Sequence, residues 1–157
     1  MKQARQISLL IAITCWAALV GAILYSHIVY FPGYLSHLPE SNKIITEYGV
    51  QDGNFWMLAH PLPILSSITA LVLNWKLRTR RKYILITIGI YIAALVATIF
   101  YFLPNLMLFA DSANSTVSPT EWHERGQTWQ HLSWIRGAGM ITGFVLLLVA
   151  LTKDNEK

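Results

Sequence analysis

Charged residues are scarce in this sequence, and their scarcity decides its broad class. Asp, Glu, Lys and Arg make up 13% of the 157 residues, and hydrophobic residues make up 54%. In ordinary soluble domains roughly a quarter of the residues are charged. A soluble core of this size would not need so much apolar sequence. The composition therefore predicts a single integral membrane domain over residues 1–157.

Cysteine is almost absent as well. The single Cys15 lies inside an apolar run, which excludes a disulfide framework and a Cys-x-x-Cys thiol relay. The formal net charge of +4 does not indicate nucleic acid, because the basic residues collect at the ends of apolar runs rather than among stacking aromatics. We therefore expect a hydrophobic small molecule and membrane lipid as partners, and the sequence leaves oligomerisation open.

Long apolar runs are what the sequence has in abundance. Four of them, at 7–30, 55–73, 83–103 and 132–151, are 19 residues or longer. At ~1.5 Å per residue, about 20 helical residues cross the ~30 Å of hydrocarbon in a bilayer. The first run is longer than the core of a signal peptide, so we expect it to be retained. The pattern predicts an all-α transmembrane four-helix bundle.

Basic residues are divided unevenly between the two ends of these spans. Nine Lys and Arg residues lie at the ends that share a side with the termini, whereas the two loops on the other side hold only Lys43 and Arg125. The positive-inside rule therefore predicts that both termini are cytoplasmic. We expect a multi-pass protein of the bacterial cytoplasmic membrane or an equivalent cell membrane.

The two outer loops, 31–54 and 104–131, are long enough to be functional or disordered. We expect the first to form an ordered cap with a helical turn or two near 40–48. In the second, the polar stretch 111–116 is expected to be flexible.

A helix-start pattern follows that stretch. Ser118 and Glu121 form an S-x-x-E capping pair, with Pro119 at the first helical position. The fourth helix is therefore predicted to begin in the outer loop, well before its apolar run.

Strong polar residues gather at one depth, beneath the outer loops. With ~1.5 Å per residue, the polar groups inside the spans lie less than ~10 Å from the outer boundary. A single His near a helix end is usually structural, but polar groups from several spans at one depth, with a buried Arg among them, indicate a site. The candidate catalytic residues are His27, His60, Asn105, His131 and Arg136.

Arg136 needs a partner, because an ionised side chain in hydrocarbon costs at least ~2.5 kcal/mol. We expect it to pair with the carboxylate of Asp52 or Glu47, or with an anionic ligand. Aromatic and basic residues at the same depth are candidates for substrate binding, although interfacial anchoring alone explains most such aromatics. These candidates are Trp56, Trp122, Arg125, Trp129 and Trp134.

Three kinds of chemistry fit such a pocket. A metal site from His27, His60 and His131 is geometrically possible, although the sequence has no His-x-x-x-His or Glu-x-x-His pair. Two facing His from the first two spans are also compatible with haem. The third possibility needs no cofactor: a neutral His takes a proton from a weakly acidic aromatic substrate, and Arg or Asn stabilises the oxyanion. The cofactor therefore stays open.

Several short pieces of the sequence resemble a known family. They are Gly21-Ala-Ile-Leu-Tyr, Pro32-Gly-Tyr-Leu, Pro104-Asn105-x-x-Leu, and Trp122…Arg125-Gly…Trp129…Trp134-Ile-Arg136 before a Gly-rich last span. Together they span most of the chain and are similar to the anthrone oxygenase-like family of small four-span membrane proteins. The resemblance implies a four-helix bundle and, for characterised members, oxidation of an anthrone to an anthraquinone by dioxygen with no evident cofactor. By this resemblance, Asn105, Trp129 and Arg136 are the positions expected to have the functional role of the matching family residues.

Two hypotheses about function follow. The first is an oxygenase-type enzyme that acts on a hydrophobic aromatic or quinol-like molecule in an outer-leaflet polar pocket. The alternative is a non-enzymatic scaffold or small subunit, in which the polar layer only holds the bundle together. A pocket enzyme should bind an aromatic ligand, whereas a scaffold should co-purify with another membrane protein.

Overall fold

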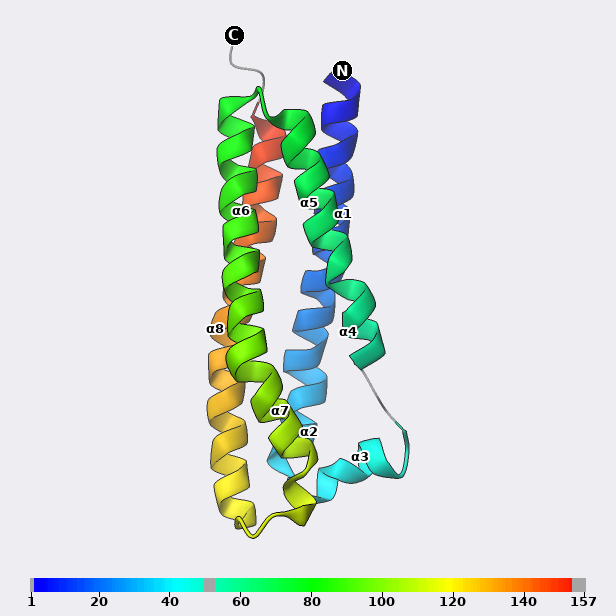
Figure 1. The fold of residues 1–157 in the computed structure, drawn as a ribbon, viewed down its shortest axis with the longest axis vertical. Coiled ribbons are helices and arrows are strands. Elements are labelled where there is room, and N and C mark those ends of the chain that lie inside the picture. The colour runs from blue at the N-terminus through cyan, green and yellow to red at the C-terminus, as the bar shows by residue number, and fades with distance from the viewer. Residues whose placement is uncertain (1, 50–52, 154–157) are drawn as a thin grey trace.

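The computed structural model describes residues 2–49 and 53–153. Within these residues all regular structure is helical, and the long helices form an up-and-down bundle (Figure 1). Four helices are long and apolar enough to cross a membrane: Lys2–Ser36, Gly53–Asn74, Arg78–Ala110 and Pro119–Thr152. The predicted all-α four-helix bundle is confirmed.

The helices close into a ring. α1 (Lys2–Tyr25) packs on α5 (Pro61–Asn74), α5 on α6 (Arg78–Ala97), α6 on α8 (Pro119–Thr152), and α8 on α1. α1 begins and α8 ends at the same end of the bundle (Figure 1), as four spans require. The core between the four helices is formed by Leu9, Ala12, Trp16, Leu19, Ile23, Ala70, Ile84, Tyr91, Met140, Leu147 and Ala150.

Two of the spanning helices contain a π-helical segment. α1 continues through η1 (Ser26–Tyr30) into α2 (Phe31–Ser36), and α6 continues through η3 (Thr98–Phe102) into α7 (Leu103–Ala110). Each π segment ends two residues before a proline, Pro32 or Pro104. Proline removes one helical hydrogen bond and collides with the carbonyl four residues earlier, and a wider π turn relieves both problems.

This local adjustment corrects the predicted loop boundaries. The first and third helices pass through their prolines and end at Ser36 and Ala110, so loops beginning at 31 and 104 were predicted too early. The extended fourth helix is confirmed. α8 begins at Pro119, and the Ser118 hydroxyl accepts the backbone N–H of Glu121 at 3.3 Å.

The described parts of the outer loops form an ordered cap. The helical turns predicted near 40–48 are present as η2 (Glu40–Asn42) and α3 (Lys43–Thr46). The Asn42 amide donates to the Phe109 carbonyl at 3.1 Å and to the Ser112 hydroxyl at 2.9 Å, so the first loop is bonded to the second. The stretch predicted to be flexible therefore contains a 3₁₀ turn, η4 (Ser112–Asn114), that is held in place.

A buried arginine ties the opposite end of the bundle together. Arg80 is 4% exposed, and its Nε donates to the Lys153 carbonyl at 2.8 Å. Its Nη1 donates to Asn74 Oδ1 at 3.3 Å, and the Asn74 amide donates to the Arg5 carbonyl at 3.2 Å. Carbonyls at a helix C-terminus lack helical partners, so this arginine satisfies the end of α8. In the sequence, Arg80 was only one of the nine basic residues on the side of the termini.

Membrane topology provides the first testable prediction. In a Cys15→Ser background, a cysteine at the exposed position Ser115 should react with a membrane-impermeant thiol reagent added outside intact cells, whereas one at Thr79 should not. Lysed cells should label both positions and serve as the control. If only Thr79→Cys is labelled from outside, the orientation in the membrane is the opposite of the predicted one.

Candidate functional site

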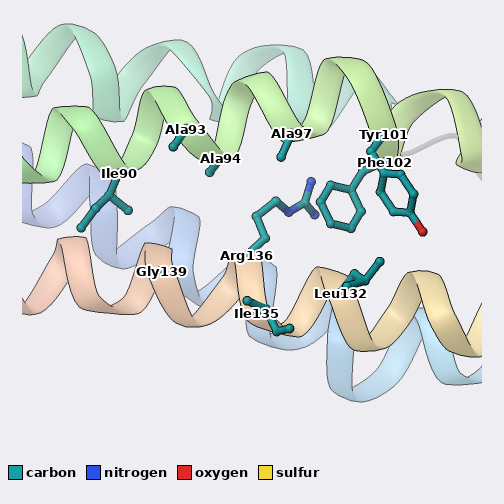
Figure 2. A pocket seen from close by; sticks show the side chains of 10 residues that line it. All are labelled: Ile90, Ala93, Ala94, Ala97, Tyr101, Phe102, Leu132, Ile135, Arg136 and Gly139. Carbon is teal, nitrogen blue, oxygen red and sulfur yellow. The ribbon is translucent and has the colours of Figure 1, made fainter.

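A groove between α6 and α8 contains Arg136, the partly buried arginine of the polar layer (Figure 2). Its volume is about 460 Å³, within the range of small-molecule sites. Ile135 and Leu132 are 69% and 40% exposed, so the groove opens sideways, toward lipid. Among the described residues, Arg136 is the only charged one in the lining, which consists of Ile90, Ala93, Ala94, Ala97, Tyr101, Phe102, Leu132, Ile135, Arg136 and Gly139.

Neutral groups surround the Arg136 guanidinium. Nη1 donates to Thr98 Oγ1 at 2.7 Å and Nη2 donates to Ser133 Oγ at 3.0 Å. The guanidinium carbon lies 4.2 Å from the centroid of the Phe102 ring, a favourable cation–π distance. Figure 2 shows the side chain reaching from α8 across the groove toward this ring.

The predicted carboxylate partner is not found. Among the described residues the only ion pair joins Arg125 to Glu121, so Glu47 does not pair with Arg136. Asp52 lies outside the described residues. The positive charge of Arg136 is therefore held by hydroxyl oxygens and an aromatic face, without a neutralising carboxylate in the part of the chain that the structure describes.

The Thr98 and Ser133 hydroxyls, which accept hydrogen bonds from Arg136, donate hydrogen bonds to further groups. The Thr98 hydroxyl donates to the Ala94 carbonyl at 2.7 Å. His27 Nδ1 lies 2.8 Å from the Ile23 carbonyl, and Nε2 lies 2.9 Å from Ser133 Oγ. Because a carbonyl only accepts, we assign the proton to Nδ1, so Nε2 of the neutral ring accepts from the Ser133 hydroxyl. Ser133 thus links His27 to Arg136.

The π-helical segments bring these groups to one level. His27 belongs to η1, and Thr98 is the first residue of η3. The carbonyl of Phe102, the last residue of η3, accepts the indole N–H of Trp129 at 3.0 Å. π turns occur often at functional sites, and here both face α8.

His60 belongs to a separate polar pair. It lies at the turn between α4 (Gly53–Ala59) and α5, where its Nδ1 is 3.1 Å from the Tyr91 hydroxyl. That hydroxyl donates to the His60 carbonyl at 2.8 Å. Tyr91 packs edge-on against Trp16 with ring centroids 5.9 Å apart, so this pair belongs to the bundle core.

The predicted three-histidine metal site is not found among the described residues. Among residues 2–49 and 53–153, no three His, Cys, Asp or Glu side chains are placed to hold a metal ion. His131 is exposed. His27 is 2% exposed and both of its ring nitrogens are bonded within the protein, so neither is free to ligate zinc or iron.

The other candidates lie outside the groove. The Asn105 amide donates to the Tyr101 carbonyl of its own helix at 2.8 Å. Arg125 is bonded to Glu121 at the surface and lies over the Trp122 ring at 5.2 Å. Trp56 packs against Phe55 and His60, Trp134 lies against His27, and Trp122 and Trp129 belong to an aromatic core under the outer loops. Of the residues predicted for catalysis or binding, only Arg136 lines the groove.

Sequence reasoning missed the residues that complete the site. Ser133 precedes Arg136 by three residues and therefore shares its helix face, a signal that was available. Thr98 is a polar residue within an apolar run. Nothing in the sequence distinguished Tyr101 and Phe102 from other interfacial aromatics.

The fold and the groove define a class of protein, a four-helix membrane bundle with an arginine in a lipid-facing groove. No family model, curated protein or solved structure matches this chain.

Proposed function

We propose that this protein binds a lipid-soluble aromatic molecule with an acidic oxygen in the groove between α6 and α8, and oxidises it with dioxygen. One observation carries the proposal. In the described part of the chain, Arg136 is the only charged residue of an apolar groove, and its partners are neutral. A partly buried cation of this kind favours an anionic oxygen as its ligand.

The lining supports the same ligand class. Ala93, Ala97 and Gly139 leave space for a ring system, and the sideways opening lets a hydrophobic molecule arrive from the bilayer. The apolar body of the ligand would replace lipid against these residues, while its oxygen meets the guanidinium. A few polar groups in an apolar pocket are the usual arrangement for orienting a small molecule.

The reaction is proposed from the resemblance to the anthrone oxygenase-like family. An anthrone methylene loses a proton to give an enolate, and Arg136 stabilises its oxyanion. The carbanion then gives four electrons to dioxygen overall, so that CH₂ + O₂ becomes C=O + H₂O. The described lining contains neither His nor a carboxylate, so the proton passes to water, and His27, His60 and His131 are not needed as bases.

Oxidation of anthrone tests this function. Purified protein in detergent should accelerate anthraquinone formation above the autoxidation rate, with one O₂ consumed per anthrone and ¹⁸O from ¹⁸O₂ in the new carbonyl. Gly139→Leu should lower the rate at least tenfold, because its side chain would fill the groove. Gly89→Leu is the matched control, since a Cβ there meets no atom within 4 Å and Gly89 is not in the lining.

Different failures have different meanings. If anthrone binds to the parent, binds less to Gly139→Leu, and is not oxidised by either, the proposed reaction is wrong and the proposed binding site is supported. If Gly139→Leu and the parent oxidise anthrone at equal rates, the groove is not the site of the reaction. Stoichiometric co-purification with another membrane protein, together with no binding of aromatic acids, would favour the scaffold alternative.

A further inference from the structure

A second groove lies between α1 and α5, the pair of helices opposite α6 and α8 in the ring. Its volume is about 360 Å³, and its lining includes Ala4, Ile7 and Ile11 from α1 and Leu73 from α5. It shares no lining residue with the Arg136 groove. Its lining residues belong to the first turns of α1 and the later turns of α5, and Figure 1 shows that α1 begins and α5 ends at the same end of the bundle.

The inside of this groove requires an apolar occupant. Its two α5 hydroxyls are already bonded to their own helix, Ser66 to the Leu62 carbonyl at 2.7 Å and Thr69 to the Leu65 carbonyl at 2.9 Å. Ile7 and Ile11 are 48% and 53% exposed, so the groove opens outward to lipid. From Ala4 to Ile11 it runs for ~10 Å along α1.

Two basic residues, Arg5 and Lys76, lie close in the sequence to the residues at the end of this groove. Arg5 follows Ala4, and its carbonyl accepts the Asn74 amide at 3.2 Å, which fixes the start of α1 beside the end of α5. Lys76 is exposed and lies three residues beyond Leu73. The described acidic residues all belong to the outer loops or the first turns of α8, at the other end: Glu40, Glu47, Asp111, Glu121 and Glu124. No described carboxylate therefore neutralises this cluster.

A tryptophan places the same end at the membrane boundary. Trp75 is 52% exposed, and the Arg81 guanidinium lies 5.0 Å from its ring centroid. Exposed tryptophans are enriched at the level of lipid headgroups. The basic residues beside the groove are therefore at the height at which a lipid phosphate would lie.

We propose that the α1–α5 groove binds an anionic phospholipid, with one acyl chain along Ile7, Ile11 and Leu73 and its phosphate beside Arg5 and Lys76. The apolar groove and the basic residues, which have no described carboxylate beside them, each specify one half of this molecule. Basic residues beside a membrane attract anionic headgroups, and the groove adds a place for the chain. This site is independent of the oxidation proposed above.

Lipid retention measured by native mass spectrometry tests the headgroup half. Full-length protein in detergent is exchanged into mixed micelles with dioleoyl phosphatidylglycerol or dioleoyl phosphatidylcholine. The parent should retain phosphatidylglycerol preferentially. Arg5→Gln with Lys76→Gln should weaken that retention by roughly 25-fold, or about fivefold for each charge. Lys43→Gln with Arg125→Gln removes two charges at the other end and should change nothing.

Filling the groove tests the acyl-chain half. Ala4→Leu should reduce phosphatidylglycerol retention, whereas Ala17→Leu, at an exposed position elsewhere on α1, should not. Circular dichroism of each variant verifies that the bundle is folded. Equal retention of the two lipids, or full displacement of the lipid by millimolar inorganic phosphate, would overturn the proposal. A dimer that Ala4→Leu dissociates would assign the groove to a second copy of the chain instead.

Discussion

Arg136→Leu is expected to abolish binding of an acidic aromatic ligand and to lower turnover by ~10²-fold or more, while the bundle stays folded. The loss is large because Arg136 supplies the only charge that the described residues place in the groove. Stability should change little, since the Thr98 hydroxyl still donates to the Ala94 carbonyl and Ser133 still bonds His27. Ligand titration, oxidation rate and thermal unfolding together measure the effect.

Two further variants separate charge from geometry. Arg136→Lys keeps the charge but cannot bridge Thr98 and Ser133 as a guanidinium does, so its activity should be intermediate. Arg136→Leu combined with Asp52→Asn tests a carboxylate partner outside the described residues. If only the double variant folds, Asp52 is that partner. Full activity of single Arg136→Leu would show that Arg136 stabilises no oxyanion.

Gly143→Leu is expected to cause the largest loss of stability, about 3 kcal/mol, at the upper end of the range for overpacking. A Cβ at Gly143 would lie 2.8 and 2.9 Å from two ring carbons of Trp16. Trp16 is fully buried and donates from its indole N–H to Ser67 Oγ at 2.9 Å, so it cannot retreat without losing that bond. The Thr87 hydroxyl also donates to the Gly143 carbonyl at 3.1 Å.

Gly89→Leu is the matched comparison, because a Cβ at Gly89 meets no atom within 4 Å. Thermal unfolding of the parent and both variants in one detergent should show a clear loss for Gly143→Leu and almost none for Gly89→Leu. Similar melting temperatures for the two variants would show that the α1–α8 contact tolerates a larger residue.

The sequence alone was sufficient to predict the four-helix bundle and the residue at which α8 begins. In lipid every backbone polar group must find an internal partner, so an apolar run of about 20 residues has to be a helix whatever surrounds it. The Ser118–Glu121 cap is equally local, since its atoms lie within one turn. These features depend only on neighbours in the chain, and the structure confirms them.

Only the tertiary structure decided which polar residues meet. Counting residues along a span gives depth, but partnership depends also on the angle around each helix and on which helices are adjacent. The extra residue of a π turn rotates everything beyond it by ~100°, so the faces of α2 and α7, which follow η1 and η3, could not be assigned from a regular helical period. Among the described residues, Arg136 meets Thr98 and Ser133 instead of a loop carboxylate. Arg80, one of five basic residues in the segment 76–82, is buried at the end of α8.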